Sequence, residues 1–171
     1  MAVHDTRCDN AAADAIVLLG PPRPVTHHPI PETPEHRAAL TREITGRTGL
    51  DEATIGRVVR AFYAAARGDP LLGPVFGRVA DWEPHIARVC AFWSSVARMT
   101  GRYHGNPMAA HLLLGLGPAH FARWLALFEA TARAGCTPEG AEHLIERARR
   151  IARGLEMGIA VQRGELPPAR R

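Results

Sequence analysis

Lysine is absent from the 171 residues, so all 21 cationic side chains are arginine, and the formal net charge is only +4. A charge this small, dispersed along the chain, does not indicate a nucleic-acid partner, and we expect none. Cysteine is scarce as well. The three cysteines (Cys8, Cys90 and Cys136) are an odd number without metal-ligand spacing, which is typical of a protein in a reducing compartment.

Long hydrophobic runs are also missing. The apolar run at residues 15–19 is too short to span a membrane. Three aspartates (Asp5, Asp9 and Asp14) precede it and no clear small-residue cleavage site follows, so it is not typical of a secretory signal. We therefore expect a cytoplasmic protein without a membrane partner.

The first 32 residues are rich in proline and lack a sustained apolar period, which predicts a polar, disordered N-terminal tail over residues 1–32. Its histidines (His4, His27 and His28) could bind a metal adventitiously, but we favour the polar tail. We expect a single domain over residues 33–163 and a C-terminal tail over 164–171.

Every apolar pattern after residue 33 has a helical period, and no segment is typical of a strand. Helix starts are predicted at Thr33-Pro34, Asp51, Asp81 and Thr137-Pro138 because each offers a capping side chain. We expect an irregular corner at residues 71–77, a helix from Asp81 to about Thr100, a brief helix around His111 and another from Pro118. The predicted fold class is all-α, with four main helices and minor ones.

Two histidines lie in apolar helical frames. His85 shares one helix face with Val89, Trp93 and Val96, and His111 lies in the segment Asn106–Leu114. Neither has a carboxylate or a cysteine beside it. Two imidazoles that face a common apolar space suit a flat hydrophobic cofactor better than a bare metal ion, which points to haem.

Several phrases, in this order and spacing, are similar to the truncated haemoglobins of the third group. They are Phe62-Tyr63, Asp69-Pro70-Leu71-Leu72-Gly73-Pro74-Val75-Phe76, Asp81-Trp82-Glu83-Pro84-His85, Phe92-Trp93, Thr100-Gly101-Arg102-Tyr103-His104-Gly105, Pro107 with His111, and His120-Phe121-Ala122-Arg123-Trp124-Leu125. The resemblance covers about residues 50–160. The paired-glycine motifs of the other two truncated groups are not evident here.

The resemblance implies a truncated globin, a two-over-two helical sandwich around one haem b. It implies that His111 is the proximal ligand of the haem iron. On the distal side it implies Tyr63 and His85, with Trp124 facing the bound ligand. It further implies that Val89 lies one turn beyond the distal histidine and that Phe76 packs on the porphyrin.

The chemistry of these side chains agrees with that assignment. A neutral imidazole is a good fifth ligand of haem iron and leaves the sixth position open for a diatomic molecule. The Tyr63 O–H and the Trp124 N–H are donors that could stabilise the partial negative charge on bound O2, and His85 could be a third donor or gate the entrance. Apolar Val89, Phe92 and Phe121 would exclude water from the cofactor, as would Phe62 and Trp93. We interpret Phe92 and Trp93 as packing residues rather than ligand contacts.

The rim of the expected pocket offers fewer signals. Arg88 lies one turn after His85 and could pair with a haem propionate, or it could be a solvated surface arginine. Arg102 and Tyr103 suggest the same role with less support. We interpret Cys90 as a small buried residue or one on the helix flank.

The predicted function is binding of O2 and related small ligands, namely CO, NO or cyanide, at a five-coordinate iron. Redox turnover, as NO dioxygenation or peroxidase-like activity, would need a separate reductase because no flavin or nicotinamide motif is present. Whether the protein is an enzyme stays open, and a ligand sensor or carrier without turnover is the alternative.

A haem-free helical interaction module is a further alternative, which would use a basic ridge of Arg149, Arg150 and Arg153. Three glutamates, Glu139, Glu142 and Glu146, precede this ridge at helical spacing. We therefore favour a salt-bridged solvent face for this part of the last helix.

Overall fold

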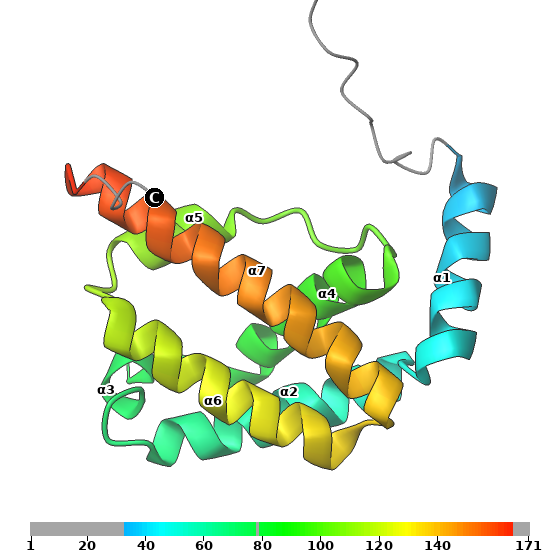
Figure 1. The fold of residues 1–171 in the computed structure, drawn as a ribbon, viewed down its shortest axis with the longest axis horizontal. Helices are drawn as coiled ribbons and strands as arrows, with labels where there is room; N and C mark the ends of the chain where they lie inside the picture. Colours follow the sequence, from blue (N-terminus) through cyan, green and yellow to red (C-terminus); the bar gives the residue numbers. More distant parts are fainter. Residues whose placement is uncertain (1–32, 78, 166–171) are drawn as a thin grey trace, which may run out of the picture. The chain divides into compact units, whose positions relative to one another are not determined.

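The computed structural model describes residues 33–77 and 79–165, which form seven α-helices and no strand (Figure 1). The predicted all-α class is confirmed. The helices are α1 (Pro34–Thr48), α2 (Glu52–Gly68), α3 (Gly73–Phe76), α4 (Trp82–Arg98), α5 (Pro107–Leu112), α6 (Pro118–Gly135) and α7 (Pro138–Gln162). The tail predicted at residues 1–32 and the end of the C-terminal tail, residues 166–171, lie outside the described residues.

The four predicted helix starts are confirmed, because each capping side chain accepts a hydrogen bond from the first turn of its helix. The Thr33 hydroxyl accepts from the backbone of His36, and the Thr137 hydroxyl accepts from that of Gly140. The carboxylates of Asp51 and Asp81 cap α2 and α4 in the same way. A side chain in this position satisfies a backbone N–H that the helix itself leaves without a partner.

Two local predictions were wrong. The corner at residues 71–77 is not irregular throughout, because Gly73–Phe76 forms one helical turn. The N–H of Phe76 donates to the Leu72 carbonyl at 3.4 Å and that of Gly77 to the Gly73 carbonyl at 3.2 Å, and these two bonds form the turn. Helix α4 ends at Arg98 rather than at about Thr100, because Met99 takes the left-handed conformation with φ 61° and its N–H donates to the Ser95 carbonyl.

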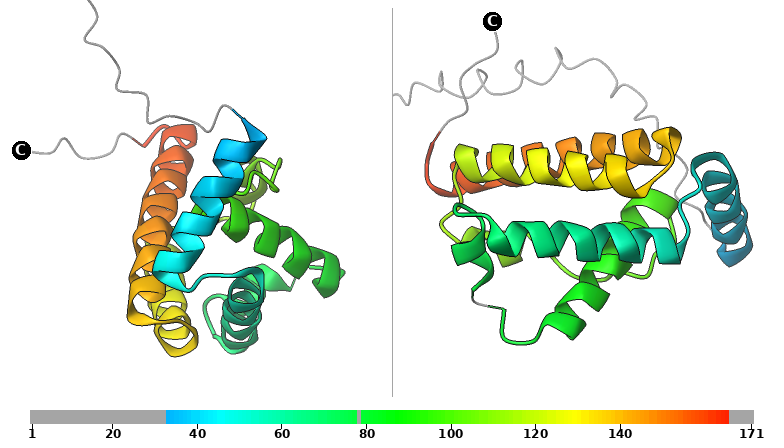
Figure 2. Two further views of the ribbon diagram at one scale, coloured as in Figure 1. Left: turned by 90° about the vertical axis from the view of Figure 1, so that its right-hand side faces the viewer. Right: turned by 90° about the horizontal axis from the view of Figure 1, so that it is seen from below.

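The long helices form two packed pairs. Helix α2 packs against α4, and α6 packs against α7, while contacts of α2 with α6 and of α4 with α7 join the two pairs. Figure 2 shows α6 and α7 running side by side above α2, with α4 crossing nearby. This is the expected two-over-two sandwich. The shorter α1 packs on α4 and α7, and α5 packs on α7.

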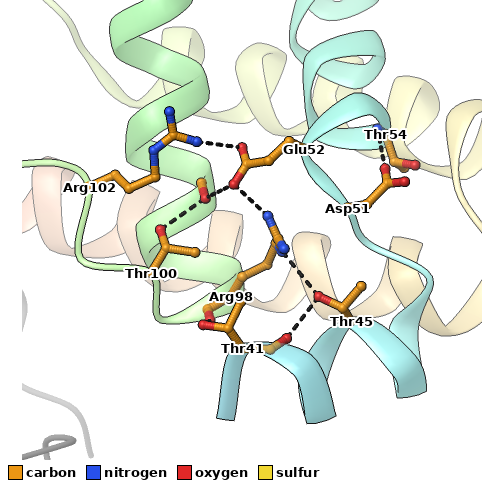
Figure 3. A network of polar contacts seen from close by, with 9 residues as sticks. Thr41, Thr45, Asp51, Glu52, Thr54, Arg98, Thr100 and Arg102 are labelled. Carbon is orange, nitrogen blue, oxygen red and sulfur yellow. Dashed lines mark hydrogen bonds and ion pairs between the residues drawn. The ribbon is translucent and has the colours of Figure 1, made fainter. Parts of the chain in front are cut away.

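Glu52, at the start of α2, holds the end of α4 and the loop that follows it (Figure 3). Its Oε1 accepts from the fully buried Ser94 hydroxyl at 2.7 Å and also from Arg98, while its Oε2 lies 3.1 Å from Arg102. Ser94 in turn contacts Thr100. One carboxylate therefore fixes the first residues of the segment that leads from α4 to α5.

No helix among the described residues has both the length and the apolar character that crossing a membrane requires.

Helix α7 contains two glycines with opposite surroundings, which gives a matched test of the packing between α7 and the end of α1. A Cβ at Gly140 would lie 2.5 Å from the Thr48 carbonyl oxygen, whereas a Cβ at Gly154 would meet nothing within 4 Å. We expect Gly140→Ala to lower the free energy of unfolding by about 1–3 kcal/mol, because backbone atoms must move apart. Gly154→Ala should raise it by about 0.5–1 kcal/mol, since alanine favours the helix. Urea unfolding followed by circular dichroism measures both, and equal effects would contradict the packing described.

Candidate functional site

A cavity of about 400 Å³ lies among α2, α3, α4, α5, α6 and α7. Its volume is within the usual range for a cofactor or small-molecule site. All nine residues that the sequence placed in the site contribute to its wall: Tyr63, Phe76, His85, Arg88, Val89, Phe92, His111, Phe121 and Trp124. The structure thus brings together side chains from five helices that are separated by up to 61 positions in the sequence (63 to 124).

Sequence reasoning missed part of the wall. Val59, Val75, Leu116, His120 and Leu155 also line the cavity. His120 carried no separate signal of its own. Its Nδ1 accepts a hydrogen bond from the Gly117 N–H at 3.2 Å, which closes the first turn of α6.

The short helix α5 brings its histidine, His111, to the cavity wall. Asn106 caps α5 by accepting from the Ala109 N–H, and Pro107 occupies the first turn. The Nδ1 of His111 lies 2.6 Å from the Pro107 carbonyl oxygen. Because a carbonyl can only accept, Nδ1 carries the proton and Nε2 of the neutral ring keeps its lone pair.

Contact with α7 holds α5 in place. Gly158 of α7 leaves room for Met108 of α5, since a Cβ at that glycine would collide with the end of the methionine side chain. The neighbouring apolar cluster of Leu116, Phe121, Leu155 and Ile159 also packs against Met108 and Leu112. These contacts fix a six-residue helix that would not be stable on its own.

Tyr63 and His85 meet on another part of the wall. Their rings lie edge to face with centroids 5.0 Å apart. Burial raises the pKa of the Tyr63 hydroxyl well above its ordinary value of 10, with a smaller contribution from Cys90, so the hydroxyl stays protonated. Within the described part of the chain, no hydrogen-bond partner meets this hydroxyl, and it is available as a donor.

His85 carries a polar atom that is buried and unsatisfied. Its Nε2 is inaccessible to solvent and has no hydrogen-bond partner among residues 33–77 and 79–165. Burial lowers the pKa of this imidazole, and the positive charge of Arg88 lowers it further, so the neutral ring is favoured. A buried polar atom without a partner is rare in native proteins and indicates a missing ligand or water.

Trp124 is held in the wall by a stack of aromatic rings. Its ring is nearly parallel to that of Phe128, with an angle of 8° and centroids 5.2 Å apart. Phe128 stacks in turn on Trp93 at 4.5 Å, and Phe62 meets both Trp124 and Phe128 edge to face. Trp93 is buried, in agreement with its predicted packing role.

Tyr103 and Arg102, the two weaker candidates for the rim of the pocket, occupy different places. Tyr103 lines the cavity and packs edge to face on Phe92, while its backbone N–H donates to the Ser95 hydroxyl. Arg102 instead pairs with Glu52 and is absent from the cavity wall. Arg88 lines the cavity and is exposed, which is the position that pairing with a carboxylate at the rim would require.

Comparison with known proteins gives the same picture. The chain is 30% identical over 109 residues to the group 3 truncated hemoglobin ctb of Campylobacter jejuni, which covers 60% of this chain and 86% of that protein. The crystal structure of a group III truncated hemoglobin from the same organism is also similar, with a TM-score of 0.58 and 30% identity over 63% of this chain and 89% of the other. No protein-family model matches the chain.

This chain belongs to the group 3 truncated haemoglobins.

Membership of this globin family implies haem, and the residues of the cavity fit that group. The wall is mainly apolar, one imidazole keeps a free Nε2, and a second imidazole has a buried Nε2 without a partner. Within residues 33–77 and 79–165 there is no cluster of three His, Cys, Asp or Glu side chains that could hold a bare metal ion. The donor set therefore matches an iron that brings its own equatorial ligands.

The basic ridge of this globin is largely paired, as favoured from the sequence, although the partners differ in part. Arg150 pairs with Glu146 within α7 as expected. Arg149 instead reaches Glu129 on α6, and Glu142 pairs with Arg133 of α6. The spacing on one helix could not reveal these pairs, because their partners come from the neighbouring helix.

The corner before α3 is fixed by the buried carboxylate of Asp69. Its Oδ1 accepts from the N–H groups of Leu71 and Leu72, and its Oδ2 lies 2.6 Å from Nε of Arg123 on α6. The hydrogen bond from the Leu72 N–H and the one from Arg123 are the main causes that lower the pKa of this carboxyl. Asp69 thus sets the chain direction that brings Phe76 to the cavity.

We expect Asp69→Asn to lower the melting temperature at neutral pH, because the amide loses the charged contact with Arg123. The folded-state pKa lies below the ordinary value of 3.8, so the stabilisation is complete above that value and is lost as the pH falls through the lowered pKa. The difference between wild type and variant should therefore shrink under acid conditions. Thermal unfolding between pH 7 and pH 2 measures it. Glu129→Gln, which removes an exposed pair with Arg149, serves as the control and should change little. A difference for Asp69→Asn that is the same at every pH would contradict this assignment.

Proposed function

We propose that this truncated haemoglobin binds haem b, with His111 as the proximal ligand, and takes up O2 and other small ligands such as CO, NO and cyanide in the distal half of the cavity. The observation that carries the proposal is that one mainly apolar cavity has two imidazoles in its wall, His111 with a free Nε2 and His85 with an unsatisfied Nε2. The haem type is proposed as b because none of the three cysteines lies in a Cys-x-x-Cys-His motif.

The bound group supplies an iron with one coordination position open to a diatomic ligand. The protein supplies the rest. The hydrogen bond between His111 Nδ1 and the Pro107 carbonyl fixes the ring and makes its Nε2 more basic, which strengthens it as a metal ligand. Arg88, which lines the cavity and is exposed, would bind a carboxylate of the haem.

The distal side chains provide donors in a site that excludes water. The Tyr63 hydroxyl is protonated, and the Trp124 indole N–H can only donate. A ligand with partial negative charge, such as O2, would accept from these groups. Val89, Phe92 and Phe121 surround the cofactor with apolar surface. For the location we propose the cytoplasm, since Cys90 and Cys136 are free thiols.

The first test is titration of the purified chain with haem, followed by absorption spectra of the ferric, ferrous and ferrous-CO forms. We expect stoichiometric uptake and the CO spectrum of an imidazole-ligated iron. His111→Gly should lose that spectrum or bind haem weakly, and added imidazole should restore it by filling the space left. His104→Gly is the matched control because its imidazole is exposed in the preceding loop. Unaltered ligation in His111→Gly, or no haem uptake by the wild type, would overturn the proposal.

The role of the distal donor is tested by the two tyrosines of the chain. Tyr63→Phe should speed O2 dissociation about fivefold, since loss of one hydrogen bond costs about 1 kcal/mol. Tyr103→Phe should leave the rate unchanged, because that side chain lies on the rim beside Phe92. Stopped-flow mixing with excess CO measures both rates. An equal rate in Tyr63→Phe and wild type would assign the stabilisation to Trp124 or His85.

A further inference from the structure

The His85 imidazole stays inside the protein although its Nε2 lacks a partner among the residues that the structure describes. Water would satisfy this atom if the side chain turned outward, so other contacts must hold the ring in place. The rings around it provide them. Tyr63 meets it edge to face at 5.0 Å, and Trp82 does so at 5.6 Å. Tyr63 and Trp82 also meet each other at 5.7 Å, so that each of the three rings contacts the other two.

Trp82 occupies a specific place in this cluster. It lies in the first turn of α4, three residues before His85 and so on the same helix face. Side chains of a helix lean toward its N-terminus, and the His85 ring therefore leans onto the turn that carries Trp82. Trp82 is half-buried, and it is absent from the cavity wall that the described residues form. It can act on a ligand only through the wall residues that it contacts, which are His85, Tyr63 and Phe76.

The indole is fixed from outside by a cation. The guanidinium carbon of Arg67, on α2, lies over the Trp82 ring at 4.4 Å from the centroid. Such a cation–π contact favours one orientation of the indole and joins the end of α2 to the start of α4. Phe76 of α3 contacts both Trp82 and Tyr63 and completes the cluster.

We propose that Trp82, covered by Arg67, is a positioning residue that holds the His85 imidazole inside the distal half of the cavity. The inference deepens the proposed function and rests on it, because it is the contact of His85 with the ligand that Trp82 would control. The titratable and charged groups around the imidazole are the Tyr63 hydroxyl from α2, Arg88 from α4 and, beyond Trp82, Arg67.

The test is a measurement of the pKa of the His85 imidazole. This pKa is determined by NMR titration of the full chain, both before haem is added and in the ferrous-CO form. In the wild type, burial keeps this pKa below 6.5. We expect Trp82→Leu to raise it toward 6.5, because the ring gains access to water. Trp82→Phe keeps an aromatic ring and should give an intermediate value. The C–O stretch of bound CO is the second readout, and it should move to higher wavenumber in Trp82→Leu as the imidazole leaves the ligand.

Glu83→Gln is the matched control. Glu83 lies beside Trp82 and also joins α4 to α2, through an exposed pair with Arg60 at 2.8 Å, but it touches none of the rings. This variant should leave both readouts unchanged. A folded Trp82→Leu variant with the wild-type pKa and C–O stretch would overturn the proposal, as would a wild-type pKa of His85 at its ordinary value.

Arg67→Gln keeps the inference testable if Trp82→Leu does not fold, because Arg67 is exposed and its loss leaves the core intact. It should shift both readouts in the same direction as Trp82→Leu, by a smaller amount, and no shift in either Arg67→Gln or Trp82→Phe would overturn the inference. A chain that takes up no haem would contradict the proposed function instead, while the titration without haem would still decide the role of Trp82.

Discussion

The stack of Trp124, Phe128 and Trp93 is the contact on which the cavity depends. Phe128 is 1% exposed and lies between a ring from its own helix, α6, and one from α4, while Phe62 brings in α2. Three of the four long helices therefore meet through large, rigid rings rather than through flexible aliphatic chains. Rings of this kind can pack densely on one side and leave a flat, apolar surface on the other. A cavity can persist beside this core because the packing behind it does not need to collapse inward.

The cavity wall differs from this densely packed core, because some of its polar groups lack a hydrogen-bond partner within the described residues. The Tyr63 hydroxyl and the His85 Nε2 find no protein partner within the described residues, although both are held in fixed places by aromatic contacts. Leaving a buried atom such as the His85 Nε2 unsatisfied costs stability, of the order of 1–3 kcal/mol. The fold tolerates this cost at a site where a ligand can satisfy the same atoms. His111 shows the complementary arrangement, because its Nδ1 is satisfied by Pro107 and only the Nε2 is left open.

Much of this arrangement could be predicted from the sequence. Helix starts follow from local chemistry, and so Thr33, Asp51, Asp81 and Thr137 could be read directly as caps. Nine of the wall residues were also found, since the order of the motifs carries the family resemblance. The features that could not be predicted are those that depend on contacts between helices. The corner before α3 is held by the ion pair of Asp69 with Arg123 of α6, and the partner of Arg149 lies on another helix. Neither has a signature in the spacing of one segment.

The role inferred for Trp82 likewise depends on contacts between helices, which the sequence alone does not reveal. In the sequence, Trp82 is one letter of the phrase that ends in His85, and nothing in the phrase separates a ring that touches the ligand from a ring that supports one. The structure separates them, because His85 lies in the cavity wall and Trp82 lies behind it against Arg67. On this proposal, a residue outside the wall influences the ligand through the wall residue that it supports. In this chain the strength of that effect depends on a contact between α2 and α4, the same two helices that carry Tyr63 and His85. On the proposed role of Trp82, a change in how α2 and α4 pack would reach Tyr63 and His85 together, because these two helices carry both side chains.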